Sequence, residues 1–367
     1  MNAHILSLAT HTPPHILEQS ETAEFMIEML SLKDSAAQKL RKLYNNSSIL
    51  KRHSVIADFK KPRGEWSFWG NQFPQSPPTI YHRNILYKKE APELAFQAAQ
   101  LALKNWGGDP KQISHVIFVS CTGMLAPGIE FQLVNALDLN RSASRLGINF
   151  MGCFGAFKGL AVAQAFAKEN PEHRILLVCT ELCSLHLQAD LNMDTLVGNS
   201  LFADGSAAAI VGCSPTTNES PLWEIVQNAS YALEDSLDKM SWEACDTGYV
   251  MRLSSEVPKL MSTHIHSFAS ALLKGKCTEQ ECDWAIHPGG KAILQGIEKE
   301  MNLAKEQTMA SWSTLANYGN MSSATFLFVL DALKNQSHSK KWSLGIGFGP
   351  GLSIEGILLR KPHATGE

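Results

Sequence analysis

Short apolar runs alternate with longer segments of helical periodicity along most of this sequence. Residues 115–120, 145–150 and 174–181 are short and rich in Val, Ile and Leu, which is typical of buried strands. Helical segments at 89–108 and 155–170 separate these runs, and in the first of them Pro92 suits the first turn and Gly107 the end. Strands of this kind are covered on both faces, so the alternation predicts an α/β fold with a mixed sheet between helices.

The same alternation returns in the second part of the chain. Helical segments occupy 257–274, 290–301 and 322–334, and strand-like runs occupy 283–288, 342–349 and 352–360. A chain of 367 residues is long enough for two domains or one large duplicated one. We therefore expect two successive α/β halves, spanning 1–213 and 222–367.

The composition argues against several classes of protein. Lys and Arg number 32 against 35 Asp and Glu, a net charge of −3, whereas nucleic-acid binders carry a basic excess. No basic region precedes a long apolar run near the start, and no run of 18 apolar residues occurs, so we expect a cytoplasmic chain without a membrane span. The eight cysteines are scattered, and the spacing of the close pairs Cys179/Cys183 and Cys277/Cys282 is not that of a zinc site, so no metal is expected.

One cysteine stands where a strand-like run meets a helical segment. Residues 145–150 are followed by Gly152, which permits a tight turn, and then by Cys153 at the start of the helical 155–170 segment. The positive end of a helix stabilises a thiolate and lowers the pKa of a cysteine there. By itself the pattern is also typical of a structural cysteine.

Two polar residues in the second half lie at similar junctions. His287 follows the short strand-like run of DWAIHPGG, and Asn320 lies in NYGNMSSA directly before an apolar helical segment. Alone, the first would be an ordinary buried histidine and the second a helix cap. Together with Cys153 they lie where open α/β sheets place their ligand sites.

Five strings carry a resemblance to a known family. They are GCF around Cys153, LVGNSLFADGSAAAIVG, WAIHPGGKAIL around His287, YGNMSSA around Asn320, and GFGPGL near the end. In order and spacing they resemble the type III polyketide synthases, the chalcone and stilbene synthase family with its bacterial relatives. The resemblance covers nearly the whole chain and implies a thiolase-like, duplicated five-layer αβαβα fold with two pseudo-equivalent halves.

The resemblance implies roles for particular residues. Cys153, His287 and Asn320 match the family's catalytic Cys–His–Asn set, and Phe202 matches the aromatic gatekeeper between the coenzyme A tunnel and the reaction cavity. Cavity positions are matched by Ser322, Cys121, Cys183, His186 and Met251, of which the last replaces a second gatekeeper phenylalanine. For the last four, plain core packing is the alternative interpretation.

The sequence also departs from the plant members. Gly155, Ala156 and Phe157 follow Cys153-Phe154 where plant enzymes have Ala-Gly-Gly, which favours a bacterial-type member. The basic residues that hold the coenzyme A phosphates do not align cleanly. Candidates are Lys51, Arg52 and Lys42, with Lys39 and Arg41 nearby, although charges on a helix are usually a solvated face.

By resemblance, Cys153 would attack a starter acyl-coenzyme A as the thiolate of a resting thiolate–imidazolium pair with His287. His287 and Asn320 would then stabilise the enolate that forms as malonyl-coenzyme A loses carbon dioxide. Coenzyme A thioesters are substrates, no cofactor is expected, and the family implies a homodimer. Products would be pyrones, resorcinols or chalcone-like compounds, with a fatty acyl starter preferred.

Three other functions remain open at this point, and a fourth is excluded. An initiating β-ketoacyl–carrier-protein synthase has the same fold and the same types of catalytic residue, but performs a single condensation onto a carrier protein. A thiolase-type synthase would not decarboxylate, and a silent binding protein of the same fold would have no reactive cysteine. A papain-like hydrolase also uses Cys, His and Asn, but the signature around its cysteine is absent here.

Overall fold

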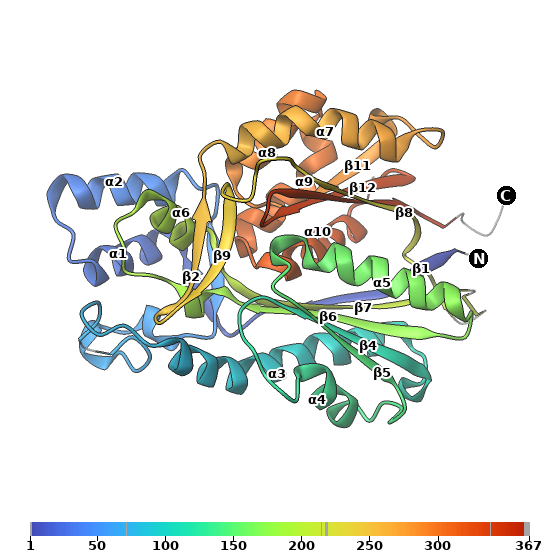
Figure 1. Cartoon of the computed structure of the whole chain (residues 1–367), viewed down its shortest axis with the longest axis horizontal. Helices are drawn as coiled ribbons and strands as arrows, with labels where there is room; N and C mark the ends of the chain where they lie inside the picture. Colours follow the sequence, from blue (N-terminus) through green and yellow to red (C-terminus); the bar gives the residue numbers. More distant parts are fainter. Residues whose placement is uncertain (1, 71, 214, 217–218, 338, 363–367) are drawn as a thin grey trace.

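Nine strands form one hydrogen-bonded order in the computed structural model, which describes residues 2–70, 72–213, 215–216, 219–337 and 339–362. Figure 1 shows this order bent into two facing sheets, with helices outside each and between them, which makes five αβαβα layers. The order is β11 (Cys282–Ile286), β12 (Trp342–Gly349), β13 (Ser353–Arg360), β8 (Trp223–Ala232), β1 (Ala3–His11), β7 (Asp204–Cys213), β6 (Arg174–Leu182), β4 (Ile113–Ser120) and β5 (Ser144–Asn149). The predicted α/β fold is confirmed.

The two halves of the chain repeat the same topology. The first half orders its strands β1-β7-β6-β4, and the second orders its strands β8-β13-β12-β11. In each half the first two pairs are antiparallel and the third is parallel. The predicted duplication is therefore visible strand by strand, and β5 has no counterpart among the described residues of the second half.

Two apolar helices lie between the sheets, α5 (Gly155–Glu169) and α10 (Thr325–Lys334) (Figure 1). The rings of Phe157 and Phe326, one from each helix, are in contact, with centroids 4.0 Å apart and planes tilted by 30°. A Cβ on Gly155 would lie 2.7 Å from Val119 Cγ1 and 3.2 Å from Ser323 Cβ, so glycine permits this close approach. The outer layers are α3 (Ile80–Trp106) with α4 (Ile129–Ala136), and α7 (Val257–Leu273), α8 (Lys291–Met301) and α9 (Lys305–Tyr318).

The prediction for the start of α3 is wrong. The helix begins nine residues before the predicted segment, at Ile80, where the Thr79 side chain accepts from the backbone N–H of His82. Pro92 therefore lies inside the helix, not in its first turn. The carbonyl that its missing N–H leaves free belongs to exposed Lys88, where water can bind it. Gly107 ends the helix with φ +75°, as predicted.

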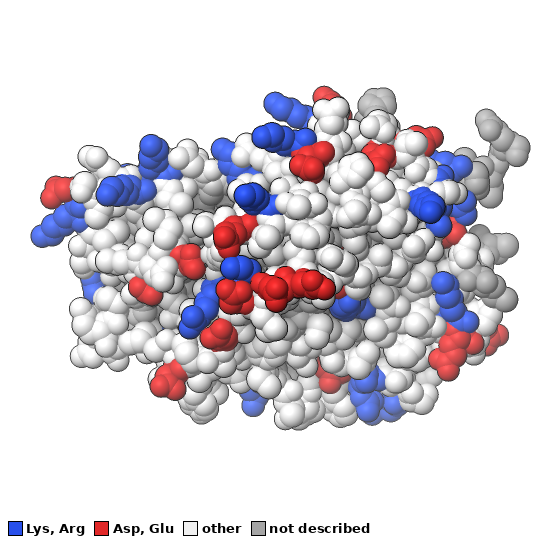
Figure 2. All heavy atoms as spheres, turned by 45° about the horizontal axis from the view of Figure 1, so that its top comes forward, with Lys and Arg blue, Asp and Glu red and all other residues white. Residues whose placement is uncertain are grey.

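Smaller elements close one end of the sheets, at the left of Figure 1. They are α1 (Gln19–Met29), α2 (Asp34–Asn45), the pair β2 (His15–Glu18) and β3 (Lys51–Ser54), α6 (Met193–Leu201), and the hairpin β9 (Met240–Cys245) and β10 (Gly248–Leu253). Among the described residues, no helix is both long and apolar enough to cross a membrane. On the face drawn in Figure 2, basic and acidic side chains are interspersed, without one broad basic patch.

Candidate active site

Cys153 lies in a single 3-10 turn, Gly152–Phe154, that leads directly into α5. Gly152 has φ +72°, and a Cβ there would lie 2.3 Å from Cδ of Pro350, so only glycine fits. A Cβ on the neighbouring Gly349 would meet the Phe154 ring at 2.5 Å. The GFGPGL string thus packs against the turn that carries Cys153, which explains why two distant motifs occur together.

Asn320 lies just before the 3-10 turn Ser322–Ala324, which leads into α10 as the turn of Cys153 leads into α5. Its backbone N–H donates to the Leu201 carbonyl at 2.9 Å, and its carbonyl accepts from Ala203 N–H at 2.9 Å. The Oδ1 atom accepts from Ser322 N–H at 2.9 Å. Both polar atoms of the amide lie 3.9 Å from Cys153 Sγ, so the thiol can donate to Oδ1 and Nδ2 can donate to the sulfur.

His287 is the first residue after β11, and its backbone N–H donates to Ile346 O at 2.7 Å. The side chain is 1% exposed, and neither ring nitrogen has a hydrogen-bond partner among the described residues. A buried polar group without a partner is costly and uncommon. The His287 ring lines the same cavity as Cys153, where a substrate oxygen could accept a hydrogen bond from its N–H. A role in substrate binding would explain why the ring has no protein partner.

A cavity of about 480 Å³ brings the three residues together. Cys153, His287 and Asn320 line its inner end, and its walls include apolar side chains of α2, α6, α7 and α8. Two small voids of about 20 and 40 Å³ lie nearby, and both share Phe202 and Met251 with the main cavity. The geometry suits an elongated ligand whose reactive carbonyl reaches Cys153.

Backbone strain accompanies this arrangement. Phe150 and Ser322 are non-glycine residues in the left-handed region, with φ +57° and +48°. One lies three residues before Cys153, and the other lies two residues after Asn320. Such conformations persist where the surroundings enforce them, and they are often found at functional sites.

Comparison with known proteins gives matches over nearly the whole chain. The N-terminal domain of chalcone and stilbene synthases matches residues 1–215, and the C-terminal domain matches residues 224–362. The chain belongs to this family. It is a type III polyketide synthase.

Relatives of this synthase are found in Dictyostelium and in a brown alga. It is 34% identical over 366 residues to "Probable polyketide synthase 1" of Dictyostelium discoideum, covering 98% of this chain but only 11% of that protein's length. The C-terminal type III domain of Steely1, a type I/III hybrid from Dictyostelium, superposes with TM-score 0.93 at 33% identity, covering 98% of this chain and 99% of that one. PKS-I from the brown alga Ectocarpus siliculosus gives 0.90 at 30%, covering 98% of both.

The protonation of the pair in this synthase differs from the expected one. Burial raises the pKa of Cys153 to about 11, against hydrogen bonds from Ser322 and Asn320 that lower it. Burial also lowers the pKa of His287 to about 3. Both directions favour a neutral thiol beside a neutral imidazole, so the expected thiolate–imidazolium pair is not supported for the ligand-free site. The start of α5 does not offset the loss of solvation.

The two side chains that the resemblance assigns to gatekeeper positions border all three spaces. Phe202 forms a parallel bridge with Asn320 and lines the main cavity and both voids. Met251 on β10 borders the same three spaces. Ser322 and Cys183 line the smallest void together with Cys153.

Two other predicted cavity residues hold the structure around the site. Cys121 Sγ accepts from Gly152 N–H at 3.0 Å, which supports the turn before the nucleophile. His186 donates from Nε2 to Thr122 O at 2.8 Å and accepts at Nδ1 from Tyr249 N–H at 3.1 Å. Both nitrogens of His186 are occupied, and burial lowers its pKa to about 3, so it is a neutral wall residue.

The basic candidates for coenzyme A separate into two groups. Arg52 does not face solvent as expected: it is 4% exposed and donates to Phe202 O at 2.6 Å and to Gln19 Oε1 at 3.0 Å. It fixes the backbone of the gatekeeper, so we withdraw it from the phosphate contacts. Lys42 is exposed near the end of α2, and Lys51 is half-buried on β3. The sequence reasoning missed Lys291, which lines the cavity at the start of α8.

A buried carboxylate also escaped the sequence reasoning. Glu181 is fully buried on β6, and it accepts from Cys121 N–H at 2.9 Å, Thr122 Oγ1 at 2.8 Å and Ser323 Oγ at 2.5 Å. Burial raises its pKa, and these hydrogen bonds lower it. The residue ties the loop after β4 to the turn after Asn320, across the two halves. A charged residue ending the apolar run 174–181 was the available signal.

Proposed function

We propose that this synthase transfers an acyl group from a coenzyme A thioester to Cys153 and extends it by decarboxylative Claisen condensation with malonyl-coenzyme A. The observation that supports the proposal is that the unpartnered, buried imidazole of His287 lines the same cavity as Cys153 and Asn320, whose Sγ and Nδ2 lie 3.9 Å apart. Nucleophile, base and hydrogen-bond donor come from three separate parts of the chain. Family membership supports the same reaction class.

In the loading step, the Cys153 thiol loses its proton to the neutral imidazole of His287 as the sulfur attacks the thioester carbonyl. Nδ2 of Asn320 donates to the oxygen that becomes negative. When the tetrahedral intermediate collapses, His287 returns the proton to the leaving coenzyme A thiolate. The imidazole is neutral again, and its N–H is free to donate in the next step.

In the extension step, malonyl-coenzyme A loses carbon dioxide, and the electron pair of the broken bond forms a thioester enolate. Asn320 and His287 donate hydrogen bonds to the enolate oxygen, each contributing about 3–4 kcal/mol by comparison with other oxyanion holes. The enolate carbon attacks the acyl-Cys153 carbonyl, the thiolate of Cys153 departs, and a proton from solvent restores the resting thiol. Loss of carbon dioxide drives the reaction, so we propose no metal, flavin or nicotinamide for it.

The coenzyme A portion would occupy the main cavity of about 480 Å³. Lys42 and Lys291 are the basic groups proposed for its phosphates, with half-buried Lys51 nearby. The two voids that Phe202 and Met251 also line hold only about 20 and 40 Å³. The proposed fatty acyl starter, and cyclisation to a pyrone, resorcinol or chalcone-like product, therefore need these two side chains to move.

The test is covalent labelling followed by product analysis. A radiolabelled acyl-coenzyme A should label the wild-type chain and the Cys245→Ala control, whose cysteine is exposed, but not Cys153→Ala. Mass spectrometry with a panel of starters then identifies the products. Labelling of Cys153→Ala at the wild-type rate would refute the nucleophile. A requirement for malonyl carrier protein in place of free malonyl-coenzyme A would favour the carrier-dependent synthase.

We further propose that the chain acts as a homodimer, as the family resemblance implies. Light scattering coupled to size-exclusion chromatography measures the mass in solution. A mass of twice 40.3 kDa is expected, and a monomer at assay concentration would contradict the proposal.

A further inference from the structure

Two histidines and a glutamate meet at the end of α5 that lies far from Cys153. His115 lies on β4, Glu169 is the last residue of α5, and His173 lies just before β6. One ligand atom of each residue lies within 4.8 Å of the other two. The histidines are half-buried and the glutamate is exposed, so the cluster opens to solvent. Nothing in the proposed condensation uses these residues.

Hydrogen bonds occupy the same nitrogen, Nδ1, in both rings. His173 Nδ1 lies 2.9 Å from Phe166 O, and because a carbonyl only accepts, Nδ1 must carry the proton. His115 Nδ1 lies 2.9 Å from Ser114 Oγ, a hydroxyl that also lies 3.1 Å from Arg174 O. When this hydroxyl donates to the carbonyl, it accepts from His115 Nδ1. In that tautomer both Nε2 atoms are left with free lone pairs, as metal-ligating imidazoles require.

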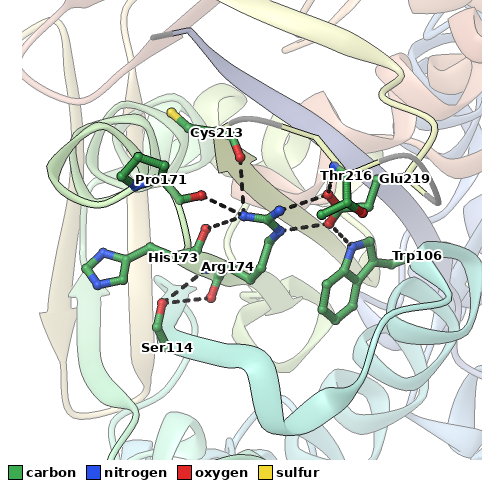
Figure 3. Close-up of polar contacts among 8 residues, drawn as sticks. All are labelled: Trp106, Ser114, Pro171, His173, Arg174, Cys213, Thr216 and Glu219. Atoms are coloured by element: carbon green, nitrogen blue, oxygen red, sulfur yellow. Dashed lines mark hydrogen bonds and ion pairs between the residues drawn. The ribbon is translucent and has the colours of Figure 1, made fainter.

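A buried ion pair holds the segment that carries His173 (Figure 3). The Arg174 guanidinium binds Glu219 through two nitrogens at 2.7 and 2.8 Å, with both side chains under a tenth exposed. It also donates to the carbonyls of Pro171 at 3.0 Å, His173 at 3.1 Å and Cys213 at 3.2 Å. The backbone of His173 is thereby held before any ligand arrives, and little ordering is left for the ligand to cause.

The local charges favour a cation. Glu169 lies at the C-terminus of α5, where the helix already carries a partial negative charge. The His173 ring donates to the Phe166 carbonyl of the same last turn, which satisfies one of its free acceptors. Lys168 is the basic residue of this turn, but it is exposed. A divalent ion beside Glu169 would therefore relieve repulsion between the carboxylate and the end of the helix.

We propose that His115 Nε2, His173 Nε2 and the Glu169 carboxylate bind a divalent transition-metal ion of the zinc class. Two imidazoles and one carboxylate suit Zn²⁺, Ni²⁺ or Co²⁺, whereas Mg²⁺ and Ca²⁺ prefer oxygen ligands. A tetrahedral site with bonds of about 2.0–2.2 Å needs its ligand atoms roughly 3.4 Å apart. The exposed Glu169 side chain is free to move inward by the remaining distance, and water would fill the fourth position.

The bound ion would be structural. The 15 residues of α5 place this site about 22 Å along the helix from Cys153, at about 1.5 Å per residue. The ion would connect β4, the end of α5 and the start of β6, the three elements that support the nucleophile helix. It takes no part in acyl transfer, so metal binding and condensation are measured independently.

The experiment is zinc titration by calorimetry on the full chain, after removal of metal with a chelator. Cys277 and Cys282 lie with their sulfurs 3.5 Å apart and could bind zinc themselves, so the titration uses a Cys277→Ser/Cys282→Ser background. The variants are His115→Ala, His173→Ala and Ser114→Ala. The matched control is His266→Ala, which removes an exposed histidine on α7. Circular dichroism checks that each variant is folded.

One zinc ion per chain should bind to the background protein and to the His266→Ala control. Either ligand variant should lose this event, and Ser114→Ala, which keeps all three ligands, should weaken it about 10–100-fold. Magnesium and calcium chloride should give no heat of binding at this site. The proposal fails if the background protein binds no zinc. It fails equally if His173→Ala binds zinc with the affinity of the His266→Ala control.

Discussion

The rate at which Cys153 is alkylated at different pH values distinguishes two resting states of the catalytic pair. Burial raises the pKa of Cys153 to about 11 and lowers that of His287 to about 3, so both groups are neutral between these values. At about pH 8 the thiolate fraction is then only about one in a thousand, since the pKa lies three pH units higher. Because the thiolate is the reactive form, the alkylation rate should rise about tenfold per pH unit up to about pH 10.

The assay treats the protein with iodoacetamide over a range of about pH 6 to 10 and quantifies the Cys153 peptide by mass spectrometry. The cavity of about 480 Å³ gives the reagent access to the sulfur. The exposed Cys245 of the same molecule serves as an internal reference for reagent quality.

A thiolate–imidazolium pair would behave differently. Its alkylation rate would be nearly flat across neutral pH, and His287→Ala would abolish that plateau. A rate for Cys153 that changes less than about twofold between about pH 6 and pH 9 would refute the reasoning. In that case the attraction between the two charges would outweigh their loss of solvation.

Three further predictions address the amide, the gate and the histidine. Asn320→Ala should slow carbon dioxide release from malonyl-coenzyme A about 10²–10³-fold, because it removes an oxyanion donor. The control Asn335→Ala, at the exposed end of α10, should not slow it. If Asn320→Ala kept a tenth of the wild-type rate, the prediction would be contradicted. Phe202→Ala should join the main cavity to the voids of about 20 and 40 Å³ and shift the products toward longer chains. Mass spectrometry measures the product lengths, and unchanged products would contradict the prediction. The pKa of His287 is lower in the folded chain than in the unfolded one. The free energy of unfolding therefore decreases as pH falls from 6.5 toward about 3, by about 2 kcal/mol near pH 5. Urea unfolding of His287→Gln should lack this acid-dependent loss, and equal losses in both proteins would contradict the assignment.

Much of the fold follows from features that act locally. Short runs of β-branched and other apolar residues become strands buried on both faces, and the helical segments between them end where glycine permits it, as at Gly107. The start of α3 was misplaced because Pro92 resembles a first-turn residue. Its actual cap, Thr79, lies in a stretch rich in proline and aromatic residues that shows no helical period.

The site was predictable as a set of residues but not as an electrostatic environment. The contexts of Cys153, His287 and Asn320 identify the family, and the structure brings all three to one cavity. Their protonation depends on how far they are removed from water, which no local pattern records. The same holds for Arg52, since a buried arginine that binds carbonyls and an exposed one have the same local sequence.

Contacts between residues far apart in the chain could not be predicted from the sequence either. His115 and His173 lie far apart along the chain, and they meet only because β4 and β6 are parallel neighbours in the sheet. Glu181 likewise joins segments that follow β4 and α9. Pairings of this kind depend on strand order, which a single sequence does not specify.

The duplication explains why the catalytic set can form at all. Cys153 and Asn320 lie at the entrances of the central helices of the two halves, and His287 after β11 corresponds to Cys121 after β4. Packing the halves face to face brings the two helix starts together, with Asn320 Nδ2 3.9 Å from Cys153 Sγ. The second half supplies an imidazole where the first supplies a thiol that supports the nucleophile turn. Because displacements of about 1 Å can cost about 10²-fold in rate, the fit between α5 and α10 is as much a part of the catalytic geometry as the reacting side chains themselves.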